Sequence, residues 1–207
     1  DGATVAMTLL NNGNVGIGTT GPGANLEVTS DTGGIIRLNS GAAVTAANES
    51  LGKLEFYSRD ASVGVAKVYG SIETLSSAIF DGTGVTGGHL VFRTGTLDTP
   101  NVERMRISKD GNVGIGTTAP GSPLSFGTGV GAKIALYDTG VGTGYGFGIQ
   151  SNLLQIYANS SSDRVGIGYG NSATFYETLS VAAGNVGIGT TNPGSILALG
   201  GTAARIF

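Results

Sequence analysis

Apolar and polar residues alternate along most of this chain, in short stretches that turn signals separate. In Lys53–Arg59, for example, Leu54 and Phe56 occupy alternate positions, and the residues beside them are charged or polar. Side chains of a strand point alternately to its two faces, so this pattern predicts a strand with one apolar face. No stretch has the 3.6-residue period of an amphipathic helix. The pattern therefore predicts an all-β fold.

The same alternation predicts strands throughout the chain. In Val102–Ser108 we expect Met105 and Ile107 to point inward and Arg104 and Arg106 to point outward. The other predicted strands are Ile35–Leu38, Val63–Ile72, Leu90–Thr94, Lys133–Asp138, Tyr145–Ile149, Leu153–Ala158 and Ala173–Val181. Predicted turns between them include Asp81-Gly82, Gly87-Gly88 and Asp98-Thr99-Pro100. The alanine-rich stretch Gly41–Leu51 fits either one helical turn or a loop.

One glycine-rich sequence occurs three times and organises the chain. It begins at Gly13, Gly111 and Gly184 and reads Gly-Asn-Val-Gly-Ile-Gly-Thr-Thr-x-Pro-Gly each time. Valine and isoleucine point to one face of this strand and glycine to the other. Glycine weakens a strand and usually marks close approach by another backbone. We therefore expect three copies of the chain to crowd together at the glycine positions, which are Gly16, Gly18, Gly114, Gly116, Gly187 and Gly189.

Each copy of the repeat predicts one small unit, which we call a clasp. The expected order is strand, tight turn, glycine-striped strand, proline turn and short strand, because Asn-Gly or Asp-Gly favours a hairpin and proline cannot join a ladder. In the third copy Leu179 and Val181 are shifted by one residue relative to the other copies, which predicts a bulge or an altered turn. Arg164–Gly168 resembles a degenerate fourth copy.

The clasps frame two inserts of unequal length. Their starts are 98 and 73 residues apart (111 − 13 and 184 − 111), whereas a solenoid has one fixed short period. We expect the chain to be a piece of something longer. The expected segments are a first clasp with an incomplete N-terminal block (1–32), a β insert with the second clasp (33–127), a second β insert with the third clasp (128–200), and the start of a truncated segment (201–207).

Composition points to burial against partner chains. Charged residues make up 12% of the chain, about half the usual share, and glycine contributes 38 of 207 residues. A monomer of this composition would expose more apolar surface than monomers usually do. The net charge of −3 argues against nucleic acid as a partner, and no apolar run approaches the roughly 20 residues that cross a bilayer. The chain has no cysteine.

The second copy carries a resemblance to a known family. Glu103–Ile107 followed by Asp110–Pro120 resembles the GNVGIGTTxP repeat of bacteriophage tail-fibre and tail-spike proteins, and Gly52–Ser58 is similar to the strand that often opens their inserts. The resemblance implies an elongated, intertwined homotrimeric fibre of short-strand β domains joined by clasps. It also implies a structural and host-adhesion role in an extracellular virion tail. The implied partners are a host-surface glycan or protein and other virion tail proteins. Similar repeats occur in bacterial surface proteins, so a bacterial surface filament or adhesin stays open.

Three features of the sequence could suggest a cofactor or metal site, but each lacks its usual context. Gly16-x-Gly18-x-x-Gly21 satisfies the dinucleotide fingerprint, but a proline turn and a strand follow where the phosphate-binding helix should begin. His89 is the only histidine, and the usual zinc ligand sets need more histidine or cysteine. Isolated turn aspartates favour local hydrogen bonds over calcium; they are Asp31, Asp60, Asp81, Asp98 and Asp138. We therefore expect no cofactor and no metal.

Four glutamates in predicted strands are the candidate catalytic carboxylates of a polysaccharide-degrading tail spike; they are Glu55, Glu73, Glu103 and Glu177. Most of them alternate with arginine or lysine. Cross-strand charge pairs on a solvent-facing side explain this arrangement without catalysis. We expect a protein that is not an enzyme and keep the glycoside hydrolase as the alternative.

Tyrosine is concentrated in the second insert. Its ring offers a large rigid contact with a polar tip, which suits chain interfaces and sugar faces. The candidates for receptor or interface contacts are Tyr137, Tyr145, Tyr157, Tyr169 and Tyr176. We favour contacts at chain–chain interfaces.

Overall fold

The computed structural model describes residues 6–59, 67–79, 87–96, 101–140, 143–171 and 173–200. Regular structure in these residues consists of strands in four sheets, without a helix, so the predicted all-β fold is confirmed. The chain divides after Gly127 into two compact units. The predicted turns Asp81-Gly82 and Asp98-Thr99-Pro100, the start of the predicted strand Val63–Ile72 and the segment 201–207 lie outside the described residues.

The first clasp forms a three-stranded sheet of β1 (Met7–Leu9), β2 (Val15–Ile17) and β3 (Leu26–Val28). β1 runs antiparallel to β2, whereas β3 runs parallel to β2. A parallel pair usually needs a crossover of a dozen or more residues. Here residues 18–25 make the crossover, so this connection must lie close to the strand that it leaves.

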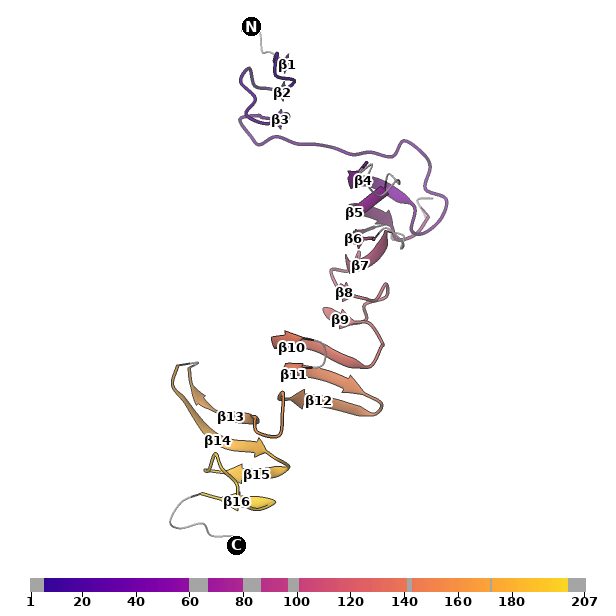
Figure 1. Ribbon diagram of the computed structural model, residues 1–207. Coiled ribbons are helices and arrows are strands. Elements are labelled where there is room, and N and C mark those ends of the chain that lie inside the picture. The colour runs from indigo at the N-terminus through magenta and orange to yellow at the C-terminus, as the bar shows by residue number, and fades with distance from the viewer. Residues whose placement is uncertain are drawn as a thin grey trace. The chain divides into compact units, whose positions relative to one another are not determined.

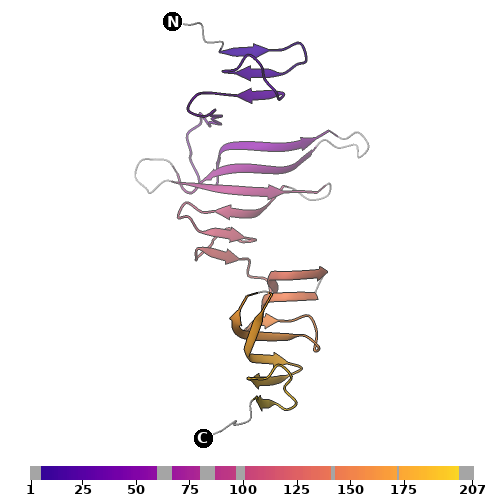
Figure 2. The same cartoon turned by 90° about the vertical axis from the view of Figure 1, so that its left-hand side faces the viewer.

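The second clasp is the end of a larger sheet, which we call the long sheet. Its strands are β4 (Ser50–Ser58), β5 (Lys67–Ser76), β6 (Gly88–Thr94), β7 (Val102–Ile107), β8 (Val113–Ile115) and β9 (Leu124–Phe126). They lie side by side in chain order (Figure 1). All neighbours are antiparallel except β8 and β9, and the insert strands β4 to β6 are longer than β8 and β9 (Figure 2).

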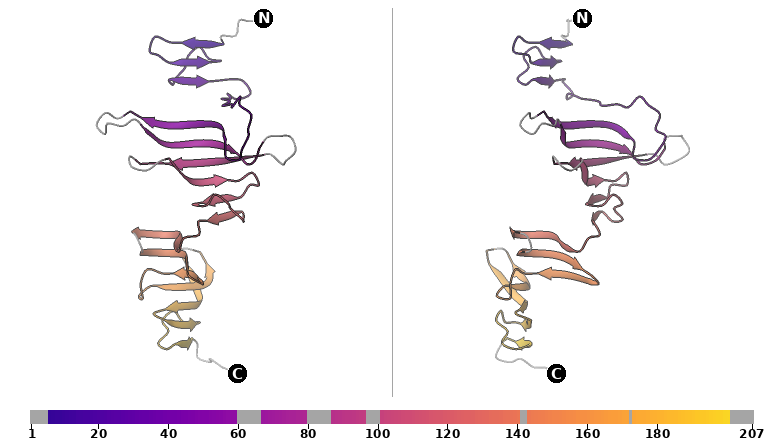
Figure 3. Two further views of the ribbon diagram at one scale, coloured as in Figure 1. Left: turned by 90° about the vertical axis from the view of Figure 1, so that its right-hand side faces the viewer. Right: turned by 45° about the vertical axis from the view of Figure 1, so that its right-hand side comes forward.

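The second unit contains two sheets. The first has the order β10-β11-β12 and the second the order β13-β14-β15-β16, in which β14 to β16 form the third clasp. β10, β11 and β12 lie side by side in Figure 3. Their bounds are β10 (Gly131–Gly140), β11 (Thr143–Gln150), β12 (Leu153–Tyr157), β13 (Arg164–Gly170), β14 (Phe175–Ala182), β15 (Asn185–Ile188) and β16 (Leu197–Leu199).

The altered turn predicted for the third clasp is confirmed. In the first clasp Gly13 has φ 88° and its N–H donates to the carbonyl of Leu10 at 2.9 Å. In the third clasp Ala182 pairs with Asn185, so Ala183 and Gly184 alone make the turn, with φ 50° and 82°. Two successive residues with positive φ are typical of a two-residue hairpin turn. The shorter turn absorbs the shift of one residue and keeps the apolar residues in register.

Two expectations about local structure are wrong. Ile35–Leu38 is not a strand: the segment passes over β4 instead, where Ser40 N–H donates to the carbonyl of Leu51 at 3.0 Å. Arg164–Gly168 is not a fourth clasp, because β13 pairs only with β14 and no parallel strand follows it. The stretch before β4, residues 41–49, is a loop rather than a helical turn.

Candidate functional site

The buried glycine of each clasp lies under the clasp's own threonine turn. A Cβ atom on Gly114 would stand 2.5 Å from the carbonyl oxygen of Thr117, which leaves no room for a side chain. A Cβ atom on Gly16 would stand 2.6 Å from the carbonyl oxygen of Thr19, and one on Gly187 would stand 2.5 Å from the carbonyl oxygen of Thr190. The predicted close approach is therefore present, but the approaching backbone belongs to the same chain. A neighbouring chain is not needed to explain these glycines.

The other invariant residues also act within the clasp. Gly18, Gly116 and Gly189 have φ values of 76°, 67° and 69°, which side-chain-bearing residues rarely adopt. The repeat asparagine spans the crossover by donating from Nδ2 to the proline carbonyl. This bond joins Asn14 to Pro22 at 3.1 Å, Asn112 to Pro120 at 3.1 Å and Asn185 to Pro193 at 3.0 Å. These hydrogen bonds therefore hold the crossover within each clasp.

One face of the long sheet is apolar and open to solvent. Cross-strand partners point to the same side. One row of partners crosses all its strands, in the order Leu54, Ile72, Phe92, Met105, Ile115 and Phe126. A second row follows β6 to β9 through Leu90, Ile107, Val113 and Leu124. Leu54 is 52% exposed, Ile115 42% and Leu124 51%. We call these two rows the apolar face.

The opposite face of the long sheet holds a network of ion pairs. Glu73, only 5% exposed, lies 3.4 Å from Lys53 Nζ and 3.0 Å from Arg93 Nε. Arg93 also reaches Glu103 at 3.9 Å, and Arg106 Nε pairs with Glu103 at 2.6 Å. We call these five side chains the ion-pair face.

The two faces reverse the expected orientation of β7. Arg106 is 5% exposed, whereas Met105 and Ile107 are only half-buried. The expectation that the arginines point outward and the apolar residues inward is therefore wrong for Arg106. The expected solvent-facing side with charge pairs is present at Lys53 and Glu55 but not at Glu73 or Arg106, whose side chains are buried. The reason is that Arg106 lies beside Gly114, where the threonine turn covers this face. Arg104 is exposed, as expected.

The candidate catalytic glutamates are held in ion pairs. Burial alone would raise the pKa of Glu73, but the hydrogen bond from Ser50 and the charges of Lys53 and Arg93 outweigh it, so its pKa lies below the ordinary value. A glycosidase acid needs a raised pKa. Glu55 pairs with Lys53 at 3.4 Å, and Glu177 lies 2.8 Å from Arg164. These geometries favour structural roles for the carboxylates.

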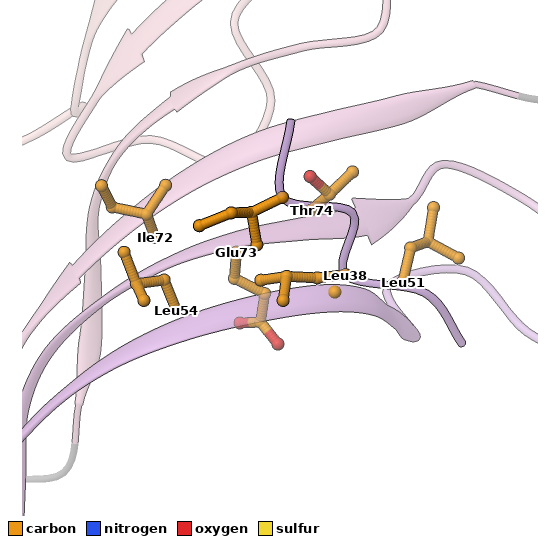
Figure 4. A pocket seen from close by; sticks show the side chains of 8 residues that line it. Leu38, Leu51, Leu54, Ile72, Glu73 and Thr74 are labelled. Atoms are coloured by element: carbon orange, nitrogen blue, oxygen red, sulfur yellow. The ribbon is translucent and has the colours of Figure 1, made fainter. Parts of the chain in front are cut away.

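A shallow groove of about 390 Å³ opens on the apolar face beside β4 and β5 (Figure 4). Leu38 lies over Gly52, since a Cβ atom there would stand 3.0 Å from the carbonyl oxygen of Leu38. The groove is lined by Ile36, Leu38, Leu51, Gly52, Leu54, Ile72, Glu73 and Thr74. Among these residues only Glu73 carries a charge, and it is engaged in the ion-pair face. The groove suits apolar contact better than bond cleavage.

The five candidate tyrosines do not form one site. Tyr137 and Tyr145 lie with ring centroids 5.9 Å apart, and Tyr169 and Tyr176 stack at 5.2 Å. Tyr157 lies over Gly146, whose Cβ atom would be 2.9 Å from the tyrosine hydroxyl.

Tyr145 connects its sheet to the loop before β13. Its hydroxyl donates to Asp163 at 3.0 Å, and this bond raises the pKa of Tyr145. Hydrogen bonds from Ser160 and then Tyr145 lower the pKa of Asp163. The four paired tyrosines lie on the same faces as apolar strand residues such as Phe147 and Ile167.

The remaining candidates stay isolated. His89 Nδ1 accepts from the Lys109 N–H at 3.1 Å, and burial followed by the charge of Arg106 lowers its pKa. In the part of the chain that the structure describes, no three histidine, aspartate or glutamate side chains gather as metal ligands would. Of the turn aspartates, Asp60, Asp81 and Asp98 and the side chain of Asp138 lie outside the described residues.

The dinucleotide fingerprint also lacks its structural context. Gly16-x-Gly18-x-x-Gly21 leads through the proline turn into β3, as expected, rather than into a helix. Among the described residues there is also no helix with the length and apolar character of a membrane span.

No family model matches the chain, and no curated protein matches it significantly. Sequence reasoning did not find the ion-pair face as a buried network. The sequence shows that Lys53, Glu55 and Glu73 alternate with apolar residues. It does not show the strand register, which decides which of these charged side chains lie side by side.

Proposed function

We propose that the chain is a non-catalytic structural and host-adhesion segment of an elongated homotrimeric bacteriophage tail fibre, extracellular and part of the virion tail. Its partners in this proposal are two further copies of itself, other virion tail proteins, and a host-surface glycan or protein. The observation that carries the proposal is the uncovered apolar face beside the buried ion-pair face. A protein that worked alone would bury the leucines and expose the charges.

The clasps support a fibre rather than a globular assembly. Each clasp ends in a short parallel pair closed by its own crossover, so the chain can add a new insert after each one. In this proposal the three chains intertwine, as the tail-fibre resemblance implies. Repeated copies of a weak adhesive surface on one particle would gain strength through avidity.

The glutamate geometry supports a role without catalysis. The proposed segment either contacts the receptor or holds a receptor-binding tip at a distance from the particle. In both roles the carboxylates stabilise the sheet, and the tyrosine pairs are candidates for chain–chain contacts or for contacts with a glycan or protein receptor.

The test is incubation of the purified chain with surface glycans of the host. We expect no new reducing ends, with or without measurable glycan binding. Sustained turnover that is lost in Glu103→Gln but retained in Glu27→Gln, a half-buried glutamate of the first clasp, would contradict the proposal and favour the tail spike. Gold-labelled antibodies against the chain would distinguish virion tails from bacterial surface filaments.

A further inference from the structure

A second groove, of about 320 Å³, opens on the ion-pair face of the long sheet. Its volume is at the lower end of the range for pockets that bind small ligands. Strands β5, β6 and β7 contribute to its lining, and so do the loop before β4 and the threonine turn of the second clasp. The lining residues are Asn48, Leu75, Arg93, Glu103, Arg106 and Thr118. We call this site the arginine groove.

The loop before β4 is fixed to β5 where it reaches the arginine groove. The Asn48 N–H donates to the carbonyl of Ser76 at 2.8 Å, and the Ser76 hydroxyl donates to the carbonyl of Ala46 at 2.9 Å. Asn48 has φ 66°, a left-handed conformation that asparagine adopts more readily than most residues. The amide side chain at the groove is therefore carried on an anchored backbone.

The two arginines of the groove are paired unequally. Arg106 donates to Glu103 twice, from Nε at 2.6 Å and from Nη2 at 2.8 Å. Arg93 Nη2 lies 3.9 Å from the same carboxylate, an ion-pair distance that is too long for a hydrogen bond. Arg93 Nε donates to Glu73 at 3.0 Å, but Glu73 also pairs with Lys53. Arg93 therefore shares both of its carboxylate partners with another cation.

The charge of the lining favours an anionic ligand. The groove has two guanidinium groups and one carboxylate, beside the buried apolar side chain of Leu75. The cross-strand partner of Leu75 is His89, whose pKa is lowered by burial and then by the charge of Arg106. One excess positive charge matches a ligand group with one negative charge. A planar carboxylate also fits the fork of a guanidinium, whereas a dianionic phosphate would bring a second negative charge beside Glu103.

We propose that the arginine groove binds one carboxylate group, with Arg93 as its charged partner and the side chains of Asn48 and Thr118 as neutral hydrogen-bond donors. Two sources share this chemistry, namely a free carboxylic acid and a sugar acid within a surface glycan. The groove lies in one chain, so the inference does not rest on the proposed fibre. A sugar source would add a chemical class to the glycan partner proposed above.

Saturation-transfer NMR on the native chain, at pH 7 and constant ionic strength, tests the ligand class. The probes are acetate, glucuronate and glucose, and inorganic phosphate is measured by its displacement of acetate. We expect acetate and glucuronate to bind, with dissociation constants on the order of 1 mM, and glucose to give no signal. Tighter binding of glucuronate than of acetate would identify the sugar acid, and equal binding the free carboxylate. Absence of both signals, equal binding of glucose, or tighter binding of phosphate would overturn the inference.

Variants locate the binding in the arginine groove. Arg93→Gln should weaken acetate binding by at least about tenfold, because it removes the charged donor. Arg104→Gln, the matched control, removes the same charge from an exposed arginine outside the lining and should bind acetate as the parent does.

A second groove variant leaves the ion pairs intact. Asn48→Gly removes only the amide side chain, and glycine adopts φ 66° without strain. We expect acetate to bind about three- to tenfold more weakly, as for the loss of one neutral hydrogen bond. Binding equal to that of the parent in either Arg93→Gln or Asn48→Gly would place the carboxylate elsewhere and contradict the inference.

Discussion

On one face of the long sheet charged side chains are buried, whereas on the other face leucine and isoleucine side chains are open to solvent. Glu73 and Arg106 are each 5% exposed, and Val91 between them is fully buried. Across the same strands, Leu54 and Ile115 remain exposed. Burying charge is costly unless each charge is paired, and the ion-pair face meets that condition within one chain.

The two faces differ in whether their side chains find interaction partners within the same chain. The ion-pair face has its partners in the same chain, so it can point outward in an assembly without further contacts. The apolar face has no such partners, and contiguous apolar surface on a soluble protein marks an interaction site. The following predictions alter one face or the other and are ordered by expected size.

A charge on the apolar face should have the largest effect. Ile115→Lys would place an unpaired ammonium in the proposed interface, at a cost of about 3–5 kcal/mol. We expect it to dissociate the assembly over the concentration range in which the parent stays associated, as measured by sedimentation velocity. Ala119→Lys, on the exposed turn of the same clasp, is the matched control and should associate normally. Equal association of the two variants would show that the apolar face is not the interface.

The second largest effect should come from adding a side chain at the buried glycine of a clasp, which should lower the free energy of unfolding. In Gly114→Ala the new methyl group would meet the Thr117 carbonyl, and such overpacking costs about 1–3 kcal/mol. Gly121→Ala has open space at the same clasp and should change the free energy of unfolding by less than about 0.5 kcal/mol. Chemical denaturation of both variants measures the difference. If Gly114→Ala left the free energy of unfolding unchanged, the threonine turn would not pack against this glycine.

Removing the asparagine of a clasp should have a smaller effect. Asn112→Ala deletes the hydrogen bond to the Pro120 carbonyl and should lower stability by about 1 kcal/mol. The equivalent change Asn185→Ala should cost about the same, because the bond to Pro193 has the same geometry. Thermal unfolding measures both, and a loss in only one clasp would refute their equivalence.

Acid should weaken the ion-pair face gradually. The folded-state pKa of Glu73 lies below the ordinary value of 4.5, so its pairing stabilises the fold fully above that pH. This stabilisation is lost as the pH falls through the folded-state pKa. Melting temperatures at pH 7 and pH 3 should therefore differ more in the parent than in Glu73→Gln. Parallel pH profiles would show that Glu73 contributes nothing to the dependence.

The strands were predictable because their signal is local. Alternation in Lys53–Arg59 and the hairpin dipeptide Asn12-Gly13 each specify structure within a few residues, and both appear as expected. The altered turn at Ala183 was also predictable, since a shift of one residue must be absorbed near it. Ile35–Leu38 failed because a run of apolar residues fits either a strand or a segment lying over one.

The two faces were less predictable because they depend on contacts across the sheet. The sequence showed that Gly114 needed a close neighbour, but not that Thr117, three residues later, supplies it. The expectation that charges face solvent put Arg106 on the wrong side. Its burial follows from the register that places it beside Gly114 and from its pair with Glu103.

Sedimentation equilibrium of the native chain tests most directly whether the apolar face is covered by other copies. The account predicts a single folded species of three times the chain mass of 20.6 kDa. A folded, monodisperse particle of 20.6 kDa, stable with its apolar face in water, would contradict it.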